Sequence, residues 1–457
     1  MTTTIQAYRF ALAPTPDQDG MLRSHCGAQR YAYNWGLGLI KANLGQREAE
    51  RSYGVANAEL TPCATWSAYS LRKNWNQAKN VVAPWWGENS KEAYASGLAN
   101  LATALGNWNT SKTGKRNGPK VRFPRFKGKR QAMSCRFTTG SIGLADADRR
   151  HVRLPRIGVV RTLESTRKLA RHVQRRTARI RSATVSYRQG RWFVSFSVEI
   201  TRVDSAPLRP DSVVGVDLGI KSLAVLSTGE VVPNPKHLEL AQRELRRLHR
   251  QAGRRTGSDR RTRQRPSGRW RRTQARISRL HTRVANARRE GLHQLTTRLA
   301  STRGTVVVED LHVAGMLRNR RLARRIAGVG WGELRRLLEY KTRRYGGRLV
   351  VAGRWYPSSK TCSDCQAVKA KLRLSERTFH CDQCGLVLDR DFNAARNLAA
   401  LVSSHSWWAT ENEPDGNPRK TTARGATGTA TGRPARTPDG STPRRKATAH
   451  DTFSHVS

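Results

Sequence analysis

The sequence predicts two folded parts: a β-rich unit with a helical insert, and then an α/β domain. Strand-like alternation of apolar and polar residues occupies 1–15 and 121–205, and helical periodicity fills 16–120 between them. From 206 to 402, apolar strands alternate with helices, which is typical of an α/β domain. The remaining residues, 403–457, are rich in Gly, Pro, Thr and Arg, and we expect them to be disordered. A chain of 457 residues is long enough for two or three domains.

The charge of the chain indicates its partner. Lys and Arg number 85 against 33 Asp and Glu, so the formal net charge is +52. A compact fold with this charge repels itself unless a polyanion neutralises it, and each neutralised phosphate also releases counterions. The composition therefore predicts nucleic acid binding, although a ribosomal or chromatin-type packaging protein would be equally basic. We expect no membrane association, because the basic residues are spread along the chain and no long apolar span occurs.

The β-rich unit contains recognisable start and turn signals. "TIQAYRFALAP" reads as a strand ending near Pro14, and helical spacing follows it. Ser90 is a candidate N-cap for the helix in "SKEAYASGLANLATALGNW". Near the end of the unit, "SATVSYRQGRWFVSFSVEI" predicts a hairpin with Gln189 and Gly190 in its turn.

A basic loop with aromatic residues joins the helical insert to the later strands. The stretch "NTSKTGKRNGPKVRFPRFKGKR" is a candidate segment for phosphate contact and base stacking. A solvated loop with two core phenylalanines is the alternative. The candidate nucleic-acid residues are Phe123, Arg125, Phe126, Lys127 and Lys129.

The α/β domain opens with "SVVGVDLGIKSLAVLSTGEVV", which predicts two strands joined by a Gly-containing turn. Residues 241–290 hold 18 arginines and three acidic residues, and apolar residues from Ile277 to Leu299 follow helical spacing. This pattern predicts a long helix with one apolar seam and an arginine-rich outer face, a candidate RNA or heteroduplex contact. "TVVVEDL" and "RLVVAGRW" are the next predicted strands.

Cysteine spacing predicts a zinc ribbon at 360–386. Two C-x-x-C pairs separated by 15 residues match a four-thiolate zinc site, which is closed and therefore structural. The ligands would be Cys362, Cys365, Cys381 and Cys384. An odd total of seven cysteines, with no apolar export segment at the N-terminus, predicts a reducing, cytoplasmic setting.

Three carboxylates stand at the ends of predicted core elements. Asp217 lies in an apolar strand, Glu309 ends "VVVE", and Asp391 opens the helical "DFNAARNLAALV". Each could pair with an arginine. Together they suggest a site for Mg²⁺, which prefers carboxylate oxygens and can act in pairs on a phosphodiester.

The combination of "GVDLGIKSLAVLSTG", "VVVEDLHVAGML" and "CSDC…CDQCGLVLDRDFNAARN" resembles the TnpB family of RNA-guided nucleases encoded by insertion sequences. The resemblance covers roughly residues 5–400. It implies an RNase H-like (RuvC) nuclease domain with the zinc ribbon inserted, preceded by a β-barrel wedge domain with a helical recognition insert. Asp217, Glu309 and Asp391 match the three acidic positions, with Asp389 a nearby competitor for the third.

The resemblance also implies activity and partners. We expect a metal-dependent DNA endonuclease using two Mg²⁺ ions and structural Zn²⁺, guided by an RNA from the element's end to double-stranded DNA beside a short flanking motif. We expect it to act as a monomer. Binding without cleavage, as a repressor, and an accessory or strand-joining role in transposition are the alternatives. One departure from the family pattern is Gln366, which stands where Gly usually follows the first cysteine pair.

Overall fold

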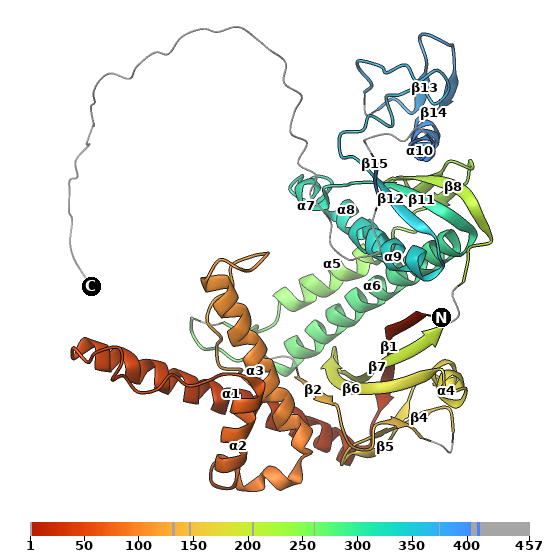
Figure 1. Cartoon of the computed structure of the whole chain (residues 1–457). Coiled ribbons are helices and arrows are strands. Elements are labelled where there is room, and N and C mark those ends of the chain that lie inside the picture. Colours follow the sequence, from red (N-terminus) through yellow and green to blue (C-terminus); the bar gives the residue numbers. More distant parts are fainter. Residues whose placement is uncertain are drawn as a thin grey trace, which may run out of the picture. The chain divides into compact units, whose positions relative to one another are not determined.

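The computed structural model describes residues 2–129, 133–145, 148–202, 205–259, 261–373, 375–403 and 409–411. All of them fall within one compact unit, Met1–Asn412. This unit contains a seven-stranded sheet, a six-stranded sheet and a small two-stranded sheet. The predicted combination of a β-rich part and an α/β part is therefore confirmed (Figure 1).

The seven-stranded sheet has the order β2-β6-β7-β1-β5-β4-β3. Its longest pairings are antiparallel and join β7 to β1 and to β6. The predicted hairpin turn is confirmed, because Gln189 (φ 55°) and Gly190 (φ 82°) both take the left-handed conformation that a two-residue turn requires. Closure into a barrel remains an expectation, since β2 and β3 are the outer strands among the described residues. The strands are Thr2–Ala13 (β1), Met133–Phe137 (β2), Gly143–Leu144 (β3), His151–Leu154 (β4), Gly158–Thr162 (β5), Ala178–Arg188 (β6) and Arg191–Arg202 (β7).

Helices fill most of the chain between β1 and β2. Thr15 opens α1 with a capping box shared with Gln18, and the predicted Ser90 cap of α3 is confirmed by its bond from the N–H of Glu92. Buried residues of α1 and α3, such as Leu37 and Leu101, share one core with the sheet. The helices are Pro16–Ser52 (α1), Ala68–Val82 (α2), the 3₁₀ turn Pro84–Glu88 (η1) and Lys91–Lys112 (α3), with Arg167–Gln174 (α4) following β5.

The six-stranded sheet has the order β10-β9-β8-β11-β12-β15. β8, β9 and β10 form an antiparallel meander, whereas β11 runs parallel to both β8 and β12. The strands are Arg209–Leu218 (β8), Ser222–Leu226 (β9), Val231–Pro233 (β10), Arg303–Glu309 (β11), Arg348–Ala352 (β12) and Ala409–Glu411 (β15).

Both faces of this sheet are covered, which explains the uninterrupted apolar run of β11. Val306 and Val308 pack under α6 (Gly268–Thr302) and α9 (Trp331–Arg344), and Val307 packs on the opposite face with Leu398 of α10 (Arg390–Ala400). Side chains alternate along a strand, so a strand covered on both sides must be apolar at every position. Figure 1 shows α6 and α9 on one side of the sheet and α10 on the other. Two short helices, Val313–Met316 (α7) and Ala323–Val329 (α8), precede α9.

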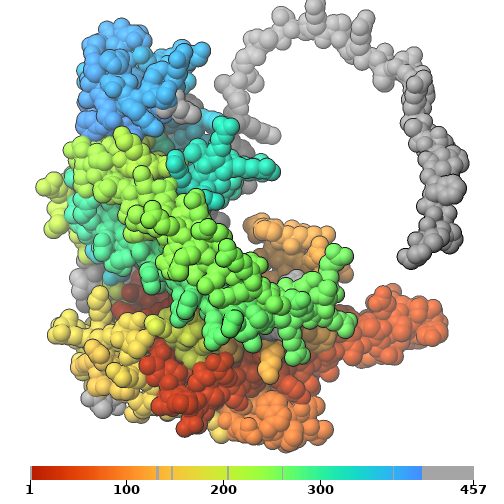
Figure 2. Space-filling view, turned by 180° about the vertical axis from the view of Figure 1, so that it is seen from behind, coloured from red at the N-terminus to blue at the C-terminus, as the bar shows by residue number. Residues whose placement is uncertain are grey.

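The predicted arginine-rich helix is confirmed as α6. Its apolar face packs against α5 in one part and toward the six-stranded sheet in another. Ile277 and Leu280 pack against Leu245 and Leu248 of α5 (His237–Gly253), while Leu292, Leu295 and Leu299 pack toward the sheet. Figure 2 shows the segment from α5 to α6, light green to green, as an exposed ridge. Its exposed arginines are 243, 246, 247, 250, 254, 261, 263, 265, 269, 271, 272, 276, 279, 283 and 289.

Lys341 fastens α9 to α6 by a buried charge. Its Nζ donates to the carbonyl of His293 at 2.7 Å and to the hydroxyls of Thr296 and Thr297 at 2.8 and 2.7 Å, and the residue is 4% exposed. Burial, followed by repulsion from Arg344, lowers the pKa of Lys341 to about 8 from its usual 10.5. Folding therefore carries a penalty for this charge near neutral pH.

We predict that the stability of the wild type rises relative to Lys341→Met as pH increases from about 8 to 10.5. In this window the unfolded chain binds a proton that the folded chain has released, a difference on the order of 3 kcal/mol at most. Urea unfolding at pH 7.5 and 10 measures it, with exposed Lys73→Met as the control. A stability gap that stays constant with pH, or that matches the control, would contradict this prediction.

One boundary of the predicted tail needs correction. Residues 409–411, which composition assigns to the tail, form β15 and pair antiparallel with β12. The edge of β12 offers unpaired backbone groups, and pairing satisfies them whatever the side chains are. Residues 404–408 and 412–457 of the predicted tail lie outside the described residues. None of the helices in the described part is long and apolar enough to cross a membrane.

Candidate active site and cysteine cluster

Asp217 and Glu309 stand at the carboxyl ends of the neighbouring parallel strands β8 and β11. Side chains two residues apart on a strand share a face, so Asp217 lies on the face of Gly215, and Glu309 on that of Val307. This is the face that α10 covers: a Cβ on Gly215 would lie 2.0 Å from the carbonyl oxygen of Ala395. Only glycine permits this close approach, which brings the start of α10 beside both carboxylates.

Asp217 and Glu309 are joined by a side-chain hydrogen bond, and Asp391 is near enough for its charge to act on both. Among the described residues, only the four cysteines form a group of three or more candidate metal ligands whose ligand atoms all lie within 4.8 Å of one another. Burial raises the pKa of Asp217 well above its usual range, and the charges of Glu309 and Asp391 raise it further. Burial also raises the pKa of Glu309, although hydrogen bonds from Ser358 and Asp217 oppose this effect. The charge of Arg390 lowers the pKa of Asp217 and of Glu309, but both pKa values remain raised because burial and the neighbouring carboxylates have the larger effect. Both shifts oppose the presence of two full negative charges on this buried pair, and a bound proton or a cation would relieve that repulsion.

Asp389 and Asp391 take different positions at the start of α10. Asp389 is the N-cap, and its Oδ1 accepts the N–H of Asp391 at 2.9 Å and of Phe392 at 3.0 Å. Its side chain is exposed, and it does not appear among the charges that raise the pKa of Asp217 or Glu309. Asp391, half-buried in the first turn, does act on both. Hydrogen bonding thus assigns Asp389 to the helix cap, while Asp391 is the one whose charge acts on the pair.

A loop between β12 and the cysteines is tied to both Glu309 and α10. Ser358 Oγ donates to Glu309 Oε1 at 2.9 Å. Asn397 Nδ2 donates to the carbonyls of Ser358 and Thr361 at 2.8 and 2.7 Å, and Asn393 Nδ2 donates to the same Thr361 carbonyl at 2.7 Å. Both asparagines are fully buried and stand four residues apart on one helix face. That spacing is visible in "NAARN", but sequence alone does not reveal what the amides hold.

The arginine pairing considered for the three carboxylates is found at their neighbour, Asp310. Its two oxygens bind Arg335 Nη1 at 2.5 Å and Arg354 Nη2 at 2.7 Å. Despite partial burial, these hydrogen bonds lower the pKa of Asp310. One acidic residue at this edge is thus neutralised by cations of the chain, while the adjacent Glu309 is directed toward Asp217.

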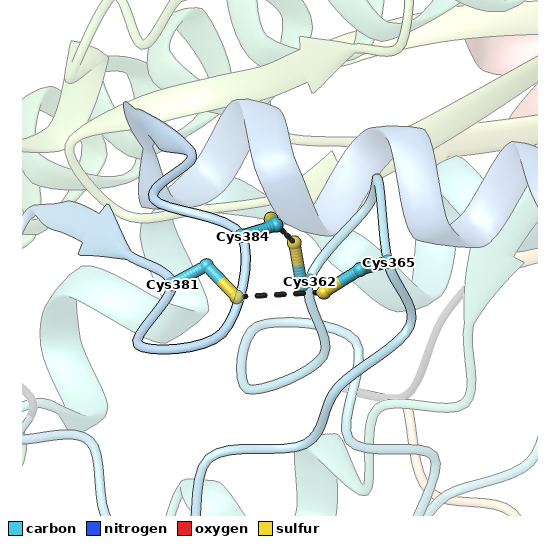
Figure 3. A group of neighbouring side chains, drawn as sticks. All are labelled: Cys362, Cys365, Cys381 and Cys384. Carbon is cyan, nitrogen blue, oxygen red and sulfur yellow. Dashed lines mark hydrogen bonds between the residues drawn. The ribbon is translucent and has the colours of Figure 1, made fainter.

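The four cysteines of the two C-x-x-C pairs converge, as Figure 3 shows. All four sulfur atoms lie within 4.8 Å of one another, with Cys362 and Cys384 at 3.6 Å and Cys365 and Cys381 at 3.5 Å. Tetrahedral zinc with Zn–S bonds of about 2.3 Å places sulfurs about 3.8 Å apart. The cluster is therefore compatible with structural zinc. Cys362 and Cys381 are buried in a small core with Phe379, whereas Cys365 and Cys384 are exposed. The hairpin Thr378–His380 (β13) and Val387–Asp389 (β14) borders the cluster.

The two cysteine knuckles have the same backbone form. The N–H of Gln366 donates to Cys362 O at 3.1 Å, and that of Gly385 donates to Cys381 O at 3.1 Å. Gln366 (φ 64°) and Gly385 (φ 72°) are both left-handed. Gln366 thus adopts the conformation of the usual Gly at a cost on the order of 1 kcal/mol, and the knuckle keeps its shape.

The five candidate nucleic-acid residues do not form one face. Phe123 packs edge-on against Trp108, with ring centroids 4.9 Å apart, and Lys127 Nζ lies 3.7 Å from the ring centroid of Tyr33. Arg125, Phe126 and Lys129 are exposed. The alternative of core phenylalanines therefore holds for Phe123 but not for Phe126.

The helical insert also contains a cavity with basic and aromatic residues in its wall, which the sequence does not predict. Lys79 Nζ lies 3.7 Å from the ring centroid of Trp86 at its wall. Spacing gives no signal for it, because its lining comes from three helical segments and the start of the following sheet. Its basic and aromatic lining residues are Arg72, Trp75, Lys79, Trp86, Lys91 and Tyr94, and Glu92, Asn76, Ala95, Thr138 and Thr139 complete the wall.

Three family models match the chain. Residues 195–320 match OrfB_IS605, described as "Probable transposase", and residues 331–398 match "Cas12f1-like, TNB domain". Residues 1–49 match a model described as "Helix-turn-helix domain". In this structure those residues form β1 and most of the single long helix α1.

Relatives cover most of the chain. "Putative RNA-guided DNA endonuclease Rv2885c" of Mycobacterium tuberculosis is 42% identical over 415 residues, 86% of each chain. A protein of the same description from Streptomyces pristinaespiralis is 33% identical over 398 residues, 86% of this chain and 89% of that one. The solved "Cas12f1-sgRNA-target DNA complex" covers 87% of this chain and 99% of its own at TM-score 0.50 and 14% identity, a likeness of fold. This chain therefore belongs to the TnpB family of IS605-type insertion sequences.

Proposed function

We propose that this protein is an RNA-guided DNA endonuclease that hydrolyses phosphodiester bonds at Asp217, Glu309 and Asp391. The observation that carries the proposal is the buried, hydrogen-bonded pair Asp217 and Glu309, with the charge of Asp391 acting on both, in a chain of net charge +52. Relatives named as RNA-guided DNA endonucleases support the choice of nucleic acid and reaction. The order β10-β9-β8-β11-β12 also fits the RNase H-like core that the family resemblance implies.

The residues divide the chemistry among them. Asp217 and Glu309 would present oxygens from rigid strand ends, and Asp391 would complete the set from α10. Mg²⁺ held there would supply an activated water and stabilise the leaving 3′-oxygen. Ser358 holds one Glu309 oxygen and so orients the carboxylate. Arg335 and Arg354 neutralise Asp310 and thus limit the excess negative charge that an incoming phosphate would meet.

The remaining basic surface would bind the nucleic acids. The exposed arginines of α5 and α6 are suited to backbone phosphates, and Phe126 with its basic neighbours is suited to an unpaired base. The cavity between α2, η1 and α3 offers cations and aromatic faces together. Base pairing with the guide would choose the target, while the protein contacts its backbone and a short flanking motif. We further propose that zinc occupies the cysteine cluster.

Reconstitution tests the proposed function. The protein is expressed together with the end of its insertion sequence. The RNA that co-purifies is then sequenced to identify the guide and so the DNA sequence that it matches. The complex should cut a duplex that matches the guide in Mg²⁺, and it should leave a mismatched duplex intact. Cleavage should stop in EDTA. Binding of the matched duplex with no strand break, across several divalent ions, would instead identify a repressor.

The two aspartates of α10 should separate in their effects. Asp389→Asn retains a good N-cap, so we expect near wild-type cleavage and stability. Asp389→Ala should cost about 1 kcal/mol of stability through the lost cap. Asp391→Asn should remove most cleavage while leaving the cap intact. Cleavage rates and thermal unfolding of the three variants measure this, and lost activity in Asp389→Asn with full activity in Asp391→Asn would reverse the assignment.

A further inference from the structure

Trp355 lies in the loop that follows β12, at the sheet edge where Glu309 ends β11, and its side chain is exposed. It is 81% exposed, against 38% for Trp85, the other tryptophan among the exposed large apolar residues described. Ala352, the last residue of β12, pairs with Glu309. Trp355 comes three residues after Ala352 in the chain. A single exposed apolar side chain is ordinary on a protein surface. An indole is also a flat, rigid face for stacking, and this one stands on a loop at the edge of a polar site.

The chain on both sides of Trp355 is held in place. Arg354 binds Asp310 at 2.7 Å, and Ser358 binds Glu309 at 2.9 Å. Between them, the N–H of Tyr356 donates to Gly353 O at 3.0 Å, and its hydroxyl donates to Asn397 O at 3.3 Å. The exposed ring is therefore carried by a loop fastened to β11 and α10. A loop anchored in this way offers a prearranged surface at low entropic cost.

From this placement we propose that Trp355 is a stacking platform for an unpaired nucleotide of the DNA strand that enters the carboxylate site. This inference rests on the proposed function. It adds that the DNA strand is unpaired where it enters the site and that Trp355 holds one of its bases. Bases inside a duplex are already stacked on one another, so only an unpaired strand can offer a base face to an exposed indole. The charge of the chain favours a polyanion over an apolar protein surface.

The first test measures stacking without cleavage. Full-length protein carrying Asp217→Asn is titrated in Mg²⁺-free buffer with a single-stranded oligo-dT that contains one 2-aminopurine, whose fluorescence falls when it stacks. Trp355→Ala should weaken binding by about 5- to 100-fold and remove the quench, and Trp355→Phe should keep most of both. Tyr53→Ala, which removes an 87%-exposed ring at the end of α1, is the control.

The second test uses the active complex. Trp355→Ala should raise KM for the matched duplex more than it lowers kcat, and Trp355→Phe should restore KM. If the wild type cuts and Trp355→Ala keeps both wild-type KM and the quench, the stacking role is wrong and the proposed function stands. If the wild type cuts nothing, the proposed function fails, and the oligonucleotide titration still decides whether Trp355 stacks bases. A Trp355→Ala defect equal to that of Tyr53→Ala would also overturn the role.

Discussion

Asp217→Asn is expected to lower the DNA cleavage rate by about 1,000-fold or more, while RNA and DNA binding stay at the wild-type level. The amide keeps the shape of the side chain but loses the anionic oxygen that a divalent cation needs, and metal stabilisation of this reaction is worth several kcal/mol. Binding is spared because most phosphate contacts are expected on the basic surface. Cleavage kinetics and a filter-binding titration measure the two effects separately.

The same substitution should not destabilise the metal-free protein. Burial and the charge of Glu309 raise the pKa of Asp217 well above its usual value. At neutral pH the folded chain therefore either retains a proton on the pair or bears the repulsion, and a neutral amide removes that penalty. We expect the thermal midpoint of Asp217→Asn to equal or exceed that of the wild type in EDTA.

Asp211→Asn is a matched control for this experiment. Asp211 lies on the same strand, β8, but its side chain is exposed at the other end. The control should change neither cleavage nor stability. Undiminished cleavage by Asp217→Asn would remove Asp217 from the catalytic set and leave the three-carboxylate mechanism without support.

Loss of the cysteine cluster should have the second largest effect. Cys362→Ser is expected to abolish stoichiometric zinc and to reduce cleavage severely. Among its described residues the ribbon buries Cys362, Phe379 and Cys381, with Ala367, Leu372 and Leu386 partly buried around them. This apolar area is too small to hold the loops, whereas a structural zinc site supplies about 10–16 kcal/mol. Zinc content by elemental analysis and cleavage rate are the measurements.

Loss of zinc should also disturb the position of Glu309, because hydrogen bonds connect the cysteine loop to it. Asn393 accepts the N–H of Ser363 at 3.0 Å, and Asn397 holds the carbonyls of Ser358 and Thr361, so the cysteine loop and the Glu309 contact share one anchor. Far-ultraviolet circular dichroism should change little, because both large sheets have cores of their own. Exposed Cys63→Ser is the control. Full cleavage by zinc-free Cys362→Ser would show that the ribbon does not support the site.

Local sequence signals predicted much of the fold for physical reasons that act over a few residues. The Gln189-Gly190 turn depends on positive φ, and the Ser90 cap on one backbone N–H. The four cysteines were predicted as a set because two short knuckles dictate the spacing of their ligands. Departures occurred where pairing is not local, as for β15, which completes a sheet edge with residues of tail-like composition.

By itself the sequence determined the ligand types, the basic charge, and the elements that carry Asp217, Glu309 and Asp391. Only the tertiary structure decided that Asp217 bonds to Glu309 with Asp391 acting on both, that Asp389 is a cap, and that Ser358 and Asn397 tie the cysteine loop to Glu309. The alternation of residues along a strand assigns each side chain to one of the two faces of the sheet. Which of these faces α10 covers depends on the close packing of its backbone at Ala395 against Gly215. That contact joins residues some 180 positions apart, beyond the reach of local pattern.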